Sequence, residues 1–168
     1  MLIYNPAFDL HHGVFRLLQL LTVDPSRKFE TERIRILDFF LLFPEEIENI
    51  RFPKELTGKR ALFRKAPNPY RNLGNARRVY AEIAPFQLAA LQSLASRGLL
   101  DPEALQNGEV IRTSHELPAN LLAAISTRNK LSPELLDLVS SNLAKLPLHG
   151  DGGLKSRANL QDTRYDAN

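Results

Sequence analysis

The chain has 168 residues, of which 43% are hydrophobic and 24% are charged, so it can bury a core of ordinary size. It contains no cysteine, which excludes disulfides, cysteine-based zinc sites and thiol catalysis. The longest apolar run, residues 39–44, is far too short to span a membrane, and the first residues lack a signal-peptide pattern. We therefore expect a soluble cytoplasmic protein.

Amphipathic helices are predicted for the N-terminal part of the chain. Apolar residues recur at helical spacing over residues 7–21 and again over residues 30–43. An Asp-Pro-Ser sequence at 24–26 separates the two helices. Glu45 and Glu46 favour a short further helix up to residue 50, because acidic side chains suit a helix N-terminus.

Residues 51–78 form a basic segment with nine Lys or Arg residues and one acid, a net charge of +8. Residues 1–50 carry −3 and residues 79–168 carry −2, so the basic excess of the whole chain lies in this segment. Its prolines and glycines predict a loop-rich structure, with a turn of helix at Leu62 and Phe63. Such a segment favours contact with DNA or with an acidic partner. The predicted contact residues are Arg51, Lys54, Lys59, Arg60, Arg64, Lys65, Arg71, Arg77 and Arg78. The alternative is a solvated connector.

Residues 79–117 have a pattern typical of the last helix and wing of a winged-helix domain. A helix over residues 86–97 ends at Gly98 as a C-cap and packs through Leu88, Leu91 and Leu94. Residues 99–100 and 110–111 would then form the two strands of a short β-hairpin. An unrelated helix followed by a hairpin would give the same pattern. The predicted helix carries a single charge, Arg97, which suits a protein interface or the core better than a DNA groove.

Two more helices are expected, at residues 118–128 and at residues 132–146, where Ser132 is the N-cap and Pro133 follows it. Residues 149–168 contain three glycines and few apolar residues, which predicts an extended tail, either disordered or ordered by a partner. The expected fold is therefore mainly α. It comprises N-terminal helices, the loop-rich basic segment and a winged-helix-like domain with a short β-hairpin, within one compact domain over residues 1–148.

The sequence contains no motif that indicates catalysis. Gly150, Gly152 and Gly153 are not followed by the Lys-Ser/Thr pair of a phosphate-binding loop. His11 and His12 are adjacent and point about 100° apart on a helix, so they cannot chelate one ion together. We therefore expect no enzyme activity, no metal and no cofactor.

Several segments together resemble one protein family. They are LIYNPAFDL (residues 2–10), ERIRILDFFLLFP (32–44), NPY (68–70), PFQLAAL (85–91), GLKSR (153–157) and RYD (164–166). In this order they are similar to the middle component of bacterial ABC-three-component systems, of the type called middle component 5. None of these segments is catalytic, so the specificity lies in their combination.

The resemblance implies a non-enzymatic adaptor encoded beside an SMC/Rad50-like ABC ATPase and an effector, often a nuclease, in anti-phage systems of the Lamassu type. Such an adaptor would help to couple DNA sensing to control of the effector, with possible non-specific contact to double-stranded DNA and none to a membrane. Lys155, Arg157, Arg164 and Tyr165 of the tail would bind a partner. The competing hypothesis is a free-standing winged-helix DNA-binding regulator, and a small hydrolase has no residues to support it.

Overall fold

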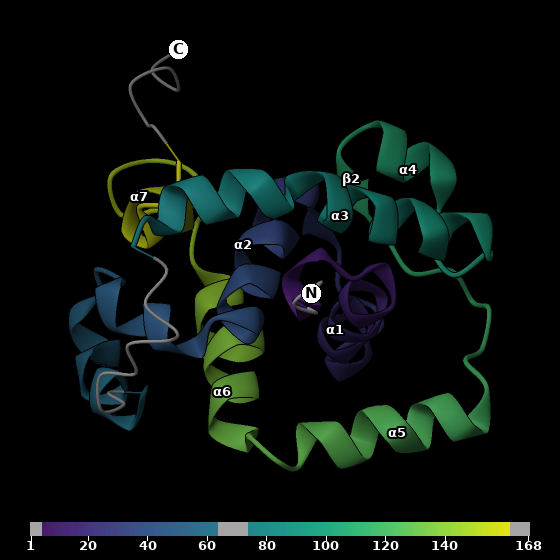
Figure 1. Cartoon of the computed structure of the whole chain (residues 1–168), viewed down its shortest axis with the longest axis horizontal. Coiled ribbons are helices and arrows are strands. Elements are labelled where there is room, and N and C mark those ends of the chain that lie inside the picture. Colours follow the sequence, from purple (N-terminus) through teal and green to yellow (C-terminus); the bar gives the residue numbers. More distant parts are fainter. Residues whose placement is uncertain (1–4, 64–73, 162–168) are drawn as a thin grey trace.

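The computed structural model describes residues 5–63 and 74–161, and these are mainly helical (Figure 1). The longer helices are α1 (Leu10–Val23), α2 (Thr31–Leu42), α3 (Ala76–Ser96) and α5 (Ala119–Asn129). The shorter ones are α4 (Pro102–Gln106), α6 (Pro133–Asp137) and α7 (Leu154–Ala158), and the strands are β1 (Phe29–Glu30) and β2 (Glu109–Val110). Four 3-10 segments, η1 (Pro6–Phe8), η2 (Pro44–Asn49), η3 (Lys54–Phe63) and η5 (Leu143–Lys145), and one π-helical segment, η4 (Leu138–Asn142), complete the described elements.

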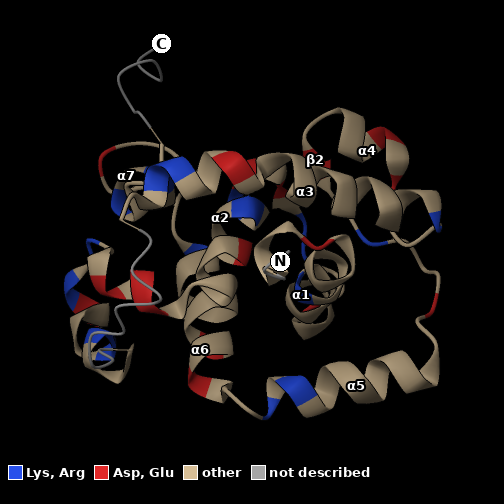
Figure 2. Ribbon diagram, in the orientation of Figure 1, with Lys and Arg blue, Asp and Glu red and all other residues tan. Residues whose placement is uncertain are grey.

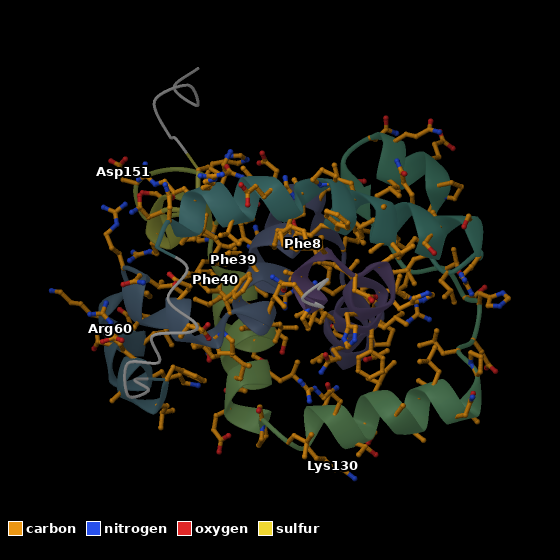
Figure 3. The ribbon with its side chains drawn as sticks, viewed as in Figure 1. Phe8, Phe39, Phe40, Arg60, Lys130 and Asp151 are labelled. Atoms are coloured by element: carbon orange, nitrogen blue, oxygen red, sulfur yellow. The ribbon has the colours of Figure 1, made fainter. Side chains whose placement is uncertain are left out.

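Helix α2 supplies the centre of the hydrophobic core. Its side chains Ile34, Ile36, Leu37, Phe39 and Phe40 are almost completely buried, although they point in different directions around the helix. The helix is buried on most of its faces, and its charged residues Arg33 and Asp38 are buried with it. Phe39 and Phe40 lie near the centre of the molecule, where their rings meet edge to face at 5.5 Å (Figure 3).

Helix α1 confirms the first predicted helix, but it starts at residue 10 instead of residue 7 because Asp9 is its N-cap. The Asp9 carboxylate accepts hydrogen bonds from the amides of His11 (2.8 Å) and His12 (3.1 Å), so the α-helix begins at Leu10. Helix α1 packs on α3 at Gly13, where a Cβ atom would lie 3.4 Å from the Cβ atom of Ala90, an ordinary van der Waals contact.

Helix α3 is longer than predicted, because it starts at Ala76 and continues through Pro85. The Asn75 side chain caps it by accepting from the amide of Arg78 at 3.1 Å. Leu91 and Leu94 are buried as predicted, but Leu88 is 41% exposed. The prediction for Leu88 was wrong. With its extra N-terminal turns, α3 buries the face that carries Ile83 and Gln87, and Leu88 lies outside this face.

The second strand of the predicted hairpin exists as β2, but its main partner is distant in sequence. β2 pairs with β1 in an antiparallel register that places Phe29 opposite Val110. Leu100 forms only an isolated antiparallel bridge, with Arg112. The predicted hairpin of residues 99–100 and 110–111 is thus reduced to this bridge, with α4 within its connection. Two backbone hydrogen bonds flank the bridge, from the Asp101 amide to the Ile111 carbonyl at 3.0 Å and from the Thr113 amide to the Leu99 carbonyl at 3.1 Å.

Two other predicted elements differ from the structure. In the basic segment, residues 54–63 form the 3-10 segment η3 where mostly loop was expected. The helix predicted at residues 132–146 is divided into α6, η4 and η5. Arg27 stabilises this irregular stretch by donating to the carbonyls of Ser140 and Ala144, both at 2.9 Å.

The described part of the predicted tail, residues 149–161, is folded rather than extended. Helix α7 lies within it, and Leu154, Ala158 and Leu160 belong to the hydrophobic core. The boundary predicted after residue 148 therefore does not separate a domain from a tail in this region. None of the helices in the described ranges combines the length and the apolar character needed to cross a membrane.

Candidate functional site

The basic segment was the first candidate site, and six of its nine predicted contact residues can be placed. These are Arg51, Lys54, Lys59, Arg60, Arg77 and Arg78. The other three, Arg64, Lys65 and Arg71, lie outside the described residues. Most of the six contact other parts of the same chain.

Arg51 joins the start of the basic segment to α7. Its amide donates to the Arg157 carbonyl at 3.0 Å, and its Nη2 donates to the carbonyl of Ser156 at 2.6 Å. Arg157 donates in return from Nη1 to the Arg51 carbonyl at 2.7 Å. The structure thus brings together two residues that the sequence had assigned to separate sites.

Lys59 and Arg60 are held by neighbouring groups. Lys59 Nζ lies 2.9 Å from Asp137 Oδ2 and 2.8 Å from Asn142 Oδ1, and its hydrogen bond lowers the pKa of the Asp137 carboxyl. Arg60 donates to the Ile50 carbonyl at 2.7 Å. The Lys59 contacts tie η3 to the segment formed by α6 and η4, and the Arg60 contact ties η3 to the end of η2.

At the start of α3, Arg77 and Arg78 differ. Arg77 donates from Nε to the Asn159 carbonyl at 3.0 Å and also to the Asn159 side chain. Arg78 pairs with Glu82 one helical turn away at 2.8 Å, but its side chain is 76% exposed. Both residues are exposed, but Arg77 binds Asn159 at the end of α7, whereas Arg78 pairs within its own helix.

Two of the four predicted partner-binding residues of the tail can be placed, and both are bound within the chain. Lys155 is buried, and its Nζ lies 3.2 Å from Glu32 Oε2 on α2. Arg157 is engaged with Arg51, and it also donates from Nε to the Gly152 carbonyl at 2.7 Å. Arg164 and Tyr165 lie outside the described residues. Much of the described basic charge therefore holds the fold together.

A second candidate surface is the outer face of α3, defined here by Ala81, Pro85, Leu88, Ala89 and Gln92, all of which are exposed. No charged residue occurs between Glu82 and Arg97, and Figure 2 shows this uncharged stretch along the helix. Apolar surface with few charges is the typical core of a protein interface. The sequence did indicate the low charge of this helix, but the exposed position of Leu88 became visible only in the fold.

The opposite face of α3 is anchored by a buried polar cluster. Gln87 Nε2 donates to Asp38 Oδ2 at 2.8 Å, and Arg16 Nε donates to Asp38 Oδ1 at 2.7 Å. Gln87 also accepts from Arg35 Nε at 3.1 Å. Because these groups are buried and satisfied by one another, the cluster fixes the orientation of α3.

The described residues do not form a group that would bind a metal through three or more His, Asp or Glu side chains. Tyr80 lies near the buried cluster, with its ring 4.8 Å from the Arg35 guanidinium carbon, and burial raises the pKa of its phenol. A buried, neutral phenol beside an arginine is explained by packing.

The structure thus defines a mainly helical protein whose candidate site is an exposed, nearly charge-free helix face. The sequence matches the model of the family ABC-three component (ABC-3C) system Middle Component 5 over residues 2–166. The chain therefore belongs to this family, as its sequence motifs indicated, and it is a component of a multi-subunit system. No curated protein and no solved structure matches the chain.

Proposed function

We propose that this protein is a non-enzymatic adaptor between an SMC/Rad50-like ABC ATPase and an effector nuclease in a bacterial anti-phage system of the Lamassu type. In this role it would contribute to DNA sensing and to control of the effector. Family membership supports a multi-subunit assembly. The exposed outer face of α3, which carries Leu88 at 41% exposure and no charge between Glu82 and Arg97, is the observation that carries the proposal.

The order of elements supports a winged-helix-like arrangement within this adaptor. α1, β1, α2 and α3 follow one another, and then the Leu100 bridge and β2 complete a small antiparallel sheet. The sheet itself pairs β2 with β1, and Arg112, two residues after β2, forms the isolated bridge with Leu100. In such an arrangement α3 takes the place of the recognition helix.

The outer face of α3 favours a protein partner over a DNA groove. Recognition helices bring cationic and polar donors to phosphates and base edges, whereas this face presents Ala81, Pro85, Leu88 and Ala89. DNA contact in our proposal is limited to exposed cations such as Lys54 and Arg78, which would bind phosphates without sequence preference.

The proposal is tested by co-expressing the tagged chain with the two neighbouring components and measuring which of them it retains. We expect retention by the unchanged chain and at least about tenfold weaker retention by Leu88→Glu, because a carboxylate in an apolar interface must be desolvated. Leu131→Glu is the matched control, since Leu131 is 66% exposed and lies outside α3. Failure of the unchanged chain to retain either component would refute the adaptor function.

A free-standing winged-helix regulator is the second candidate, and the order of elements is the observation that favours it. It predicts selective retention of one DNA sequence over random DNA at physiological salt. Uniform binding with a steep dependence on salt would instead fit the adaptor, with phosphate contacts only.

A further inference from the structure

Helix α5 is attached to the rest of the molecule by less buried surface than the other long helices. Of its 11 residues only Ile125 is buried, whereas α1 and α3 each bury six residues and α2 buries seven. In Figure 1, α5 lies along the lower edge of the molecule, next to α1 and away from α3. Burial of apolar side chains is the main force that holds a helix on a core, so a single side chain supplies most of this force for α5.

The other contacts of α5 are few or incomplete. Gln19 Nε2 donates to Asn129 Oδ1 at 2.8 Å, and among the described residues this is the only hydrogen bond between a side chain of α5 and another element. Near the start of the helix, Leu121 lines a hollow of about 340 Å³ together with Leu18 of α1 and Leu94 of α3. A side chain that borders a hollow lacks packing partners on that side, so the first turn of α5 is incompletely packed.

The helix also lacks features that would stabilise it independently of α1. Its N-cap position is Pro118, which has no side-chain group that can accept from the free amides of the first turn. Isolated helices shorter than about 12–15 residues are marginal in water, because their nucleation is costly. With 11 residues, α5 therefore depends on its contact with α1, and loss of this contact releases the whole helix together.

We propose that α5 is a detachable helix, which opens from α1 as one unit while α1, α2 and α3 stay folded. The hinges are the connections on either side of it, residues 113–118 and 130–132. Opening exposes Ile125 and removes Leu121 from one wall of the hollow. The chain then has two conformations, and a partner that binds one of them better shifts the population toward it. This inference goes beyond the adaptor function and does not depend on it, because it is tested on the chain alone.

Hydrogen exchange of the full, unchanged chain at increasing urea concentration is the first measurement. We expect amides of α5 to exchange at least about tenfold faster than those of α2, with a weaker dependence on urea because the opening exposes less surface than global unfolding. Asn129→Ala should speed exchange in α5 by a further factor of about two to ten and leave α2 and α3 unchanged. Arg128→Ala, at an exposed position of the same helix, is the matched control and should change neither.

Thiol labelling is the second measurement, and the absence of cysteine from the chain makes a single introduced thiol its only reactive one. Ile125→Cys on α5 and Leu91→Cys on α3 replace branched side chains of the same size, which are 2% and 0% exposed. Leu131→Cys, at a position that is 66% exposed, gives the rate of an unprotected thiol. We expect Ile125→Cys to react at least about 100-fold faster than Leu91→Cys in the absence of urea.

The proposal fails if α5 and α2 exchange at the same rate at every urea concentration. It also fails if Asn129→Ala speeds exchange equally in α2, α3 and α5, because the helices then open as one cooperative unit. Equal labelling rates of Ile125→Cys and Leu91→Cys would contradict it as well. Since these measurements involve no other component, loss of the adaptor function in co-expression would leave the detachable helix standing.

Discussion

Arg51 and Arg157 are 106 positions apart and hold each other's backbone. The Arg51 amide donates to the Arg157 carbonyl at 3.0 Å, and the Arg157 guanidinium donates to the Arg51 carbonyl at 2.7 Å. Because the Arg51 side chain also binds Ser156, this contact fastens α7 to the start of the basic segment. Basic residues here act as structural donors to carbonyl groups.

Replacement of Arg157 by Ala is expected to destabilise the protein by about 1–3 kcal/mol, because two hydrogen bonds from a charged donor are lost. Urea unfolding measures the loss, and hydrogen exchange should show faster exchange in α7 and at Arg51. Arg128→Ala, at an exposed site, should change stability by less than about 0.5 kcal/mol. Equal stability of the two variants would show that the Arg51–Arg157 contact is dispensable.

Gly153 occupies a position where any side chain is excluded. A Cβ atom there would lie 2.3 Å from the His149 carbonyl oxygen and 2.8 Å from that of Leu148. We expect Gly153→Ala to displace the start of α7 and to cost several kcal/mol, since backbone atoms on both sides must move. Gly152→Ala is the control, because its nearest contact would be the Arg157 side chain at 3.5 Å. Thermal unfolding compares the two variants, and an unchanged Gly153→Ala would contradict the predicted clash.

Asp38 is fully buried between Arg16 and Gln87. Asp38→Ala should cost about 3–5 kcal/mol, because it leaves the Arg16 guanidinium, which is largely buried, without its counter-charge. Asp151→Ala, at an exposed turn, is the control and should be nearly neutral. A loss below about 1 kcal/mol for Asp38→Ala in urea unfolding would mean that Arg16 reaches solvent once its partner is removed.

Glu30 gives a pH-dependent contribution to stability. Its hydrogen bonds from Arg33 lower the pKa of the Glu30 carboxyl from the ordinary value of 4.5. Since the pKa is lower in the folded state, the stabilisation is present above pH 4.5 and is lost as the pH falls through the folded-state value.

Glu30→Gln should therefore destabilise the protein at neutral pH, by less than about 1 kcal/mol because the carboxylate is half exposed. Well below pH 4.5 the difference between Glu30→Gln and the unchanged chain should shrink to zero. Urea unfolding at both pH values measures it. A difference that stays constant with pH would contradict an ionic contribution from Glu30.

Local patterns in the sequence were sufficient to predict most of the helices. Helical spacing of apolar residues placed α1 and α2 within a few residues of their observed bounds, because this signal depends on neighbours three and four positions apart. The helix expected from Pro118 onwards is likewise present as α5. The candidate surface on α3 was partly predictable, since its low charge is visible in the sequence, but Leu88 was assigned to the core. The hollow of about 340 Å³ that Leu10, Leu94 and Leu121 help to line could not be predicted, because these residues meet only after three separate helices have packed.

Composition and local periodicity thus established a mainly helical protein without cysteine chemistry, with its excess positive charge in one segment. Packing between distant segments set the rest: β2 pairs with β1, Lys155 is buried against Glu32, and Arg51 binds Arg157. Hydrophobic spacing and turn propensity act over a few residues, whereas these contacts join positions 79 or more residues apart. They form only where the apolar faces of several helices share one core, and that arrangement is a property of the whole chain.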